Sequence, residues 1–98
     1  MKKGFLEVKL PVSIFKEGKH FIAYTTALDL STSGKSFEDV KQRFDEAVTI
    51  FFEEIIKKGT LEDILTELGW RKIAREWSPP PVIAHEAEEF KIPLAAVR

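Results

Sequence analysis

The chain has 98 residues, of which 44% are hydrophobic, so it is long enough for one domain with a single core. Its 15 basic and 16 acidic residues give a net charge of -1, which excludes binding of nucleic acid or anionic lipid through overall charge. It contains no cysteine, which excludes disulfides, thiolate metal ligands and a cysteine nucleophile.

The N-terminal region is predicted to form a β-hairpin followed by a third strand. Apolar and charged residues alternate over residues 5–15, which is typical of a strand with one buried face. Residues 16–19 (Lys-Glu-Gly-Lys) predict the turn, and residues 20–27, rich in aromatic and β-branched side chains, predict the second strand. We expect residues 28–34 to add a short third strand.

The tripeptide Gly34-Lys35-Ser36 has the sequence that ends a nucleotide-binding P-loop. A P-loop needs another glycine five residues before Gly34, and this chain has Asp29 there, whose carboxylate would repel phosphate. Ser36 is followed three residues later by Asp39, which is the spacing of a capping box. We therefore predict that Ser36 caps a helix and that no nucleotide cofactor binds.

Two helices are predicted after this cap. Apolar residues recur at spacings of three and four from residue 37 onwards, as in an amphipathic helix: Phe37, Val40, Phe44, Ala47, Val48, Phe51 and Ile55. Gly59 is expected to end this long helix, after Lys57 and Lys58. Thr60 is predicted to cap a second, shorter helix that ends at Gly69.

The C-terminal part is predicted to be extended. Residues 70–77 indicate one strand, with a helical continuation as the alternative, and the three prolines at 79–81 end regular structure there. Residues 82–98 are interpreted as an extended arm or edge strand that could pair with another chain. The predicted organisation is thus an α+β domain over residues 1–77 and a Pro-initiated arm over residues 78–98. Its fold class is α+β, with a small, mostly antiparallel sheet (β-β-β-α-α-β-β) and one long helix packed on one face.

Two candidate sites, a zinc motif and a base-stacking platform, are better explained as parts of the structure without a binding role. His85-Glu86 begins like the zinc motif H-E-x-x-H, but Glu89 occupies the position of the second histidine, so we predict no metal site. Five aromatic residues could form a base-stacking platform, yet the arginines that it needs are sparse, so core packing is favoured. These are Phe5, Phe21, Tyr24, Trp70 and Trp77. We therefore predict no catalytic residue.

Several segments of the chain resemble the HicB antitoxin family. They are residues 21–24 (Phe-Ile-Ala-Tyr), 28–30 (Leu-Asp-Leu), 33–40 (Ser-Gly-Lys-Ser-Phe-Glu-Asp-Val) and 44–47 (Phe-Asp-Glu-Ala). The matched positions are the strand tyrosine, the loop aspartate, the glycine before the cap, the cap and the mid-helix pair: Tyr24, Asp29, Gly34, Ser36 and Glu46-Ala47. The resemblance covers residues 8–60, and Leu30 directly follows Asp29 where the family has Pro-Gly.

The resemblance implies a fold like a truncated ribonuclease H domain, without that fold's catalytic carboxylates. It also implies a function, which is to bind and neutralise a HicA-type toxin, a small basic ribonuclease, by occluding its active face. Family members form dimers or tetramers, so we expect a homo-oligomer with no enzymatic activity and no cofactor. Many carry a DNA-binding domain, but only 21 residues follow Trp77, so we expect no independent domain of that kind.

The sequence also suggests where partners bind. The residues chosen for toxin binding are Tyr24, Asp29, Glu86, Glu88 and Glu89, and those chosen for oligomerisation are Phe90, Ile92 and Leu94. An alternative function is that of an orphan oligomeric scaffold with the HicB fold and no toxin partner. No signal peptide or membrane-spanning segment is predicted, so we expect a cytoplasmic protein that does not bind membranes.

Overall fold

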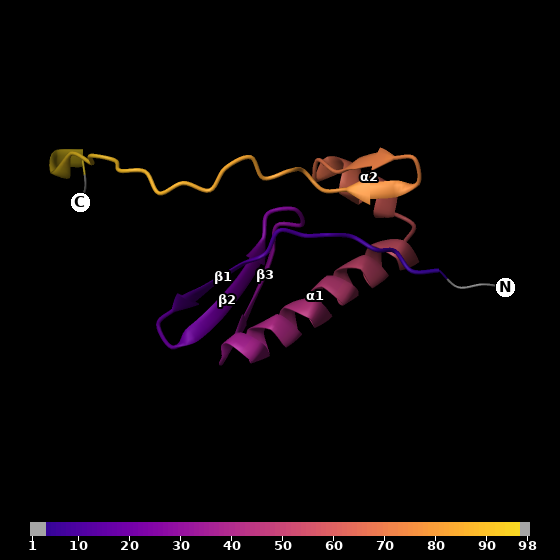
Figure 1. Ribbon diagram of the computed structural model, residues 1–98, viewed down its shortest axis with the longest axis horizontal. Coiled ribbons are helices and arrows are strands. Elements are labelled where there is room, and N and C mark those ends of the chain that lie inside the picture. The colour runs from indigo at the N-terminus through magenta and orange to yellow at the C-terminus, as the bar shows by residue number, and fades with distance from the viewer. Residues whose placement is uncertain (1–3, 97–98) are drawn as a thin grey trace.

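The computed structural model describes residues 4–96 and has an α+β fold (Figure 1). Its elements are β1 (Ser13–Glu17), β2 (His20–Thr25), β3 (Leu30–Gly34), α1 (Phe37–Lys57), α2 (Leu61–Glu67), β4 (Arg71–Ile73), β5 (Glu76–Ser78) and a 3₁₀ turn, η1 (Leu94–Ala96). The first three strands form one antiparallel sheet in the order β1-β2-β3, and β4 pairs with β5. The predicted class and order of elements are confirmed.

The strands of the first sheet have different ends from those predicted. β1 begins at Ser13, because Pro11 lacks an N–H for a strand ladder, and residues 4–12 form no regular structure. β1 then continues through two of the four residues assigned to the turn, so that only Gly18 and Lys19 connect it to β2. Gly18 has a φ of 62°, a value that glycine adopts without steric cost.

The cap of α1 is confirmed, with one change in partner. Ser36 has extended backbone angles, and its Oγ accepts a 3.0 Å hydrogen bond from the N–H of Asp39. In a capping box the third helical side chain accepts from the N–H of the cap residue, whereas Asp39 Oδ2 accepts from the preceding N–H, that of Lys35, at 2.8 Å. Lys58 and Gly59 end the helix as predicted, and Gly59 has a φ of 70°.

The helix α1 packs on one face of the sheet, mainly over β3 and β2 (Figure 1). Because side chains alternate along a strand, Ala23 points towards the helix and is fully buried with Val40 and Phe44. The predicted apolar stripe is right at its centre and wrong at its first residue, since Phe37 is 47% exposed. Phe52, absent from the predicted stripe, is buried instead.

A second core cluster lies where the C-terminal end of α1 meets α2 and the small sheet. Phe52 packs edge-on against Trp70 at 6.3 Å between ring centroids. The Trp70 indole N–H donates a 2.8 Å hydrogen bond to the carbonyl of Ala27 in the loop between β2 and β3. The cluster consists of Ala27, Leu28, Phe52, Ile55, Leu65, Trp70 and Trp77. It joins the two sheets through buried apolar surface.

Two expectations for the second half of the chain need correction. Thr60 precedes α2, but its hydroxyl donates to the carbonyl of Ile55 and does not cap the helix. The single strand predicted over residues 70–77 is a hairpin, because Ala74 adopts a φ of 60° and reverses the chain between β4 and β5. The last two strands of the predicted order are therefore these two short ones.

Residues 79–93 form an extended arm that runs past the first sheet and ends at η1, well outside the body of the molecule (Figure 1). Within residues 4–96 the arm pairs with no other strand, which agrees with the predicted extended arm, and its pairing with another chain stays a prediction. In the same described part of the chain, no helix is both long and apolar enough to cross a membrane.

Candidate functional site

Tyr24 and Asp29 form a hydrogen-bonded pair at the end of the first sheet. Tyr24 lies in β2 between Ser13 of β1 and Ser31 of β3, on the face that points away from α1. Asp29 ends the loop that follows, with a φ of 50°, and its Oδ1 accepts a 3.2 Å hydrogen bond from the Tyr24 phenol. Aspartate tolerates this left-handed conformation better than most residues, so no glycine is needed before β3.

The pair has an electrostatic signature. The hydrogen bond to the Asp29 carboxylate, followed by partial desolvation and the negative charge of Asp29, raises the pKa of Tyr24 above 10.0. Tyr24 therefore stays protonated and keeps donating to Asp29 throughout the physiological range. The pair presents a phenol edge and a carboxylate at the surface, where both can accept hydrogen bonds from a partner's basic side chains.

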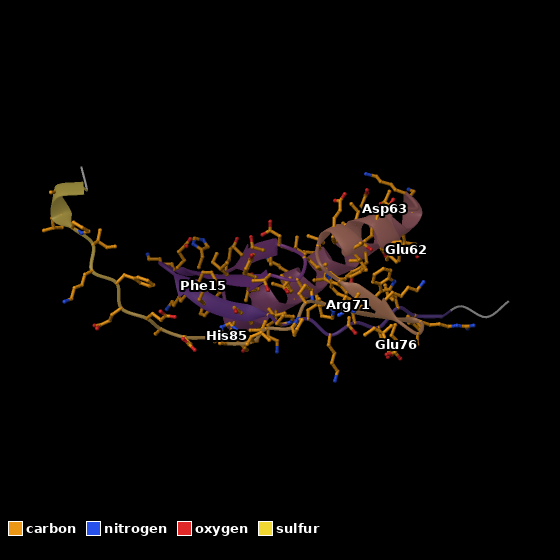
Figure 2. The ribbon with its side chains drawn as sticks, turned by 90° about the horizontal axis from the view of Figure 1, so that it is seen from above. Phe15, Glu62, Asp63, Arg71, Glu76 and His85 are labelled. Carbon is orange, nitrogen blue, oxygen red and sulfur yellow. The ribbon has the colours of Figure 1, made fainter. Side chains whose placement is uncertain are left out.

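The arm begins beside this pair. A cavity of about 290 Å³ separates its first residues from the sheet, and Tyr24 is one of the lining side chains. The lining residues are Pro11, Ser13, Tyr24, Thr26, Pro81, Val82, Ala84 and His85. Figure 2 shows His85 alongside the sheet, whereas Glu76 lies in the small sheet further along the molecule. Two separately predicted regions, the Tyr24–Asp29 pair and the arm, are thus neighbours in space.

The other predicted site residues lie further along the arm and do not join the pair. Glu86, Glu88 and Glu89 are exposed, and no hydrogen bond or ion pair links them to Tyr24 or Asp29 within residues 4–96. The oligomerisation residues are also exposed: Phe90 (76%), Ile92 (65%) and Leu94 (83%). The structure therefore offers a compact polar pair and, separately, an acidic and apolar arm.

The N-terminus of α1 is occupied by the chain's own side chains. The Ser36 hydroxyl accepts a hydrogen bond from the N–H of Asp39. The Asp39 carboxylate accepts one from the N–H of Lys35 and forms an ion pair with Nε of Arg43 at 3.2 Å. The backbone hydrogen bond from Lys35 is the main cause that lowers the pKa of Asp39 below 3.8. Of the backbone groups that a P-loop would offer to phosphate, the Lys35 N–H thus already binds a carboxylate of the protein itself, and the Asp39 N–H binds the Ser36 hydroxyl.

The remaining residue clusters point to packing. No group of three or more histidine, cysteine, aspartate or glutamate side chains within residues 4–96 could hold a metal ion. Trp70 and Trp77 are buried in the core, whereas Phe5 is almost fully exposed in the N-terminal segment. These aromatic residues do not share one open face, so they form no base-stacking platform.

An apolar groove next to β1 was missed by the sequence analysis. Because α1 lies over β2 and β3, the side chains of β1 and of the preceding segment on the helix side are only partly covered. The groove has a volume of about 340 Å³ and is lined by Val8, Leu10, Val12, Ile14, Ala23, Lys41, Phe44, Asp45 and Val48. Its signal was present in the sequence as an apolar residue at every second position from 8 to 14, a run longer than β1 itself.

Comparisons with protein-family models, with characterised proteins and with solved structures found no match to this chain. The fold and the site define an α+β module with one exposed polar pair, one open apolar groove and a projecting arm.

Proposed function

We propose that this chain is a HicB-like antitoxin, which binds a small basic HicA-type ribonuclease and neutralises it by occluding its active face. The observation that carries the proposal is the hydrogen bond between Tyr24 and Asp29. Both residues lie at positions that resemble the antitoxin family, and they meet on the face of a β-β-β-α unit that points away from α1. A positioned, exposed carboxylate such as that of Asp29 is suited to a basic protein partner.

The arm supplies charge and apolar contact area for the same partner. Glu86, Glu88 and Glu89 lie within four residues, all exposed, and would accelerate the approach of a basic protein at low salt. Phe90 is 76% exposed, and aromatic side chains such as phenylalanine are enriched in protein interfaces. In this proposal, inhibition results from binding alone, in the cytoplasm, and the chain needs no cofactor or catalytic group.

The first test is a tagged pull-down from the native lysate, read by intact-mass spectrometry. The proposal expects a small basic protein in stoichiometric amount, whose ribonuclease activity falls to background when one equivalent of this chain is added. A basic companion with ribonuclease activity that this chain leaves unchanged would contradict the proposal.

A charge reversal tests the role of the arm. Changing Glu86, Glu88 and Glu89 to lysine should weaken toxin binding by roughly tenfold or more at low salt, and the loss should shrink as salt is added. The matched control changes three exposed acidic residues outside the arm, in α2 and β5, to lysine: Asp63, Glu67 and Glu76. Equal toxin affinities for the two variants would show that the arm does not belong to the binding site.

A second candidate function is an oligomeric scaffold without a toxin. The exposed apolar residues Phe90, Ile92 and Leu94 favour it, because side chains of this kind are normally covered by another chain. It predicts that the pull-down recovers only further copies of this chain, even when neighbouring genes are expressed.

A further inference from the structure

The chain exposes far more surface than a compact monomer of its size. Its accessible area is 8627 Å², whereas a compact monomer of 11.2 kDa exposes about 5,700 Å². Its radius of gyration is 17.2 Å, compared with about 13 Å for a compact chain of this length. The excess of about 2,900 Å² exceeds the total area of about 1,200–2,000 Å² that a standard protein interface buries.

Much of this excess belongs to an arm with the pattern of an edge strand. All residues from 81 to 95 are exposed, and apolar side chains occupy alternate positions at Phe90, Ile92 and Leu94. In an extended chain Phe90 and Ile92 point to one side, together with Glu86 and Glu88, and Leu94 follows as the first residue of η1, where it joins them only if the strand extends by one residue. The arm therefore carries one face that is acidic at its beginning and apolar at its end.

The groove beside β1 has the complementary pattern. β1 is an edge strand, so its outer backbone groups are open to another strand. Ile14, Val12 and Leu10 line the groove one after another. At the end of this row lie two lysines, Lys16 on β1 and Lys41 on α1, and neither forms an ion pair within the described residues. Their ammonium groups rest over the rings of Phe21 and Phe37.

We propose that residues 88–93 of one copy add as an antiparallel strand to the open edge of β1 of a second copy. Phe90, Ile92 and Leu94 then enter the apolar groove of that copy. The antiparallel direction places Phe90 near Ile14 and Ile92 near Val12, with Leu94 near Leu10. A reciprocal exchange gives a closed dimer in which each copy donates one arm and fills one groove.

Charge fixes this direction of the arm. With Phe90 near Ile14, the preceding residues Glu86 and Glu88 lie next to Lys16 and Lys41 of the second copy. The opposite direction would carry both glutamates away from these lysines. Pro93 also fits, because N–H groups alternate sides along a strand. If the even-numbered residues of the arm form the hydrogen bonds to β1, the backbone groups of residue 93 point away from β1. Pro93, which has no N–H, therefore costs the pairing no hydrogen bond.

The arm is directed to a second copy because of where it begins. Its first residues lie over Ser13 and Tyr24, on the face of the sheet opposite the groove. To fill its own groove, the arm would have to pass round β1 and reverse direction between His85 and Glu88. These three residue steps span at most about 11 Å, which is too short for such a path. This inference concerns two copies of the chain and holds with or without a toxin.

Solution mass is the first test of the exchange. The full chain should be a dimer by light scattering, and changing Phe90, Ile92 and Leu94 together to aspartate should give a monomer with an unchanged far-ultraviolet circular dichroism spectrum. The control, Ile73→Asp, replaces an equally exposed apolar residue in β4 and should remain a dimer. A monomeric full chain, or a triple variant that stays dimeric, would overturn the proposal.

Introduced cysteines test the register, since the chain has none of its own. A mixture of Ile92→Cys and Val12→Cys chains should form a mixed disulfide roughly a hundredfold faster than a mixture of Ile73→Cys and Val12→Cys chains, because docking raises the effective concentration to the millimolar range. Equal rates for the two mixtures would refute the proposed register. A double variant, Val12→Cys with Ile92→Cys, that closes within one monomer would show that each arm fills its own groove, and the proposal would be wrong.

Discussion

The phenol of Tyr24 donates a 3.2 Å hydrogen bond to the carboxylate of Asp29, and this contact links β2 to the last residue of the loop before β3. The two residues are five apart in sequence, and the loop between them returns the chain so that their side chains meet on the face of the sheet that points away from α1. Asp29 serves both as the left-handed turn residue and as the acceptor of this bond. Substitution of Asp29 should thus change the pKa of Tyr24.

The first prediction uses the fact that Tyr24 is the only tyrosine in the chain. Replacing Asp29 with asparagine keeps a side chain that tolerates the left-handed conformation but removes the charge. The pKa of Tyr24 should therefore fall towards 10.0, because the carboxylate that stabilises the protonated phenol is gone. The measurement is phenolate absorbance against pH.

The control is Asp63→Asn, which removes an exposed carboxylate on α2 and should leave the titration of Tyr24 unchanged. The sign of the linkage gives a second readout. A phenol whose folded pKa is raised adds stability below its unfolded pKa, and that stability is lost as pH rises through the folded value. The stability of the parent chain should therefore fall more than that of Asp29→Asn above about pH 10. Identical titration curves would contradict the assigned hydrogen bond.

The second prediction concerns Gly34, where β3 passes closest to α1. A Cβ at this position would lie 2.6 Å from the backbone N and 2.7 Å from the Cα of Val40, so strand and helix would have to move apart. Gly34→Ala should lower the free energy of unfolding by about 1–3 kcal/mol, as overpacking does in well-packed cores. Urea unfolding followed by tryptophan fluorescence measures the loss.

Gly4→Ala is the matched control for this substitution, because an added Cβ there meets no atom within 4 Å. Its midpoint should equal that of the parent chain. If Gly34→Ala were as stable as Gly4→Ala, the close approach of β3 to α1 would be wrong, and with it the packing of the helix on this sheet.

Local patterns were sufficient to predict α1 and the first hairpin. The spacing of Val40 and Phe44, the cap at Ser36 and the glycine at 59 all act within a few residues, so they can be read from sequence. The second hairpin was missed because Ala74 takes the left-handed conformation of the turn, and alanine carries no turn signal.

Relationships that depend on three-dimensional placement could not be predicted in this way. Tyr24 and Asp29 were each chosen as site residues, but their contact follows from the path of the loop between β2 and β3. The groove beside β1 exists because α1 lies over β3 and β2 and leaves β1 partly uncovered. The apolar spacing along α1 predicts which face of the helix is buried, but not over which strands the helix lies. The outward course of the arm likewise depends on what its first residues contact.

The third prediction concerns the pH dependence of the α1 cap. The pKa of Asp39 is lowered mainly by the hydrogen bond from the Lys35 N–H and also by Arg43. A carboxyl whose folded pKa is depressed adds stability above its unfolded value of 3.8, and that stability is lost as pH falls through the lower folded value. Asp39→Asn should thus be less stable than the parent at about pH 6, and the difference should shrink towards about pH 3.

Ser36→Ala is the control at the same cap, since it removes a hydrogen bond without removing a titrating group. It should cost about 1 kcal/mol at both pH values. Urea midpoints of the three chains at the two pH values are sufficient for this comparison. A difference between Asp39→Asn and the parent that stays constant with pH would mean that the carboxylate does not act through its charge.

The last prediction concerns the hydrogen bond from Trp70 to the loop between β2 and β3, which lies inside the second core cluster. The Trp70 indole donates to the Ala27 carbonyl at 2.8 Å in a buried setting, so Trp70→Phe leaves that carbonyl without its partner and also removes ring volume. We expect a loss of about 2–3 kcal/mol, the sum of an unsatisfied buried acceptor and a small cavity. The control is Trp77→Phe in the same cluster, where the indole lies beneath the Lys72 ammonium, and its loss should be about 1 kcal/mol. Chemical unfolding of both variants measures the difference, and equal losses would mean that the bond from Trp70 to Ala27 adds nothing to the packing of the ring.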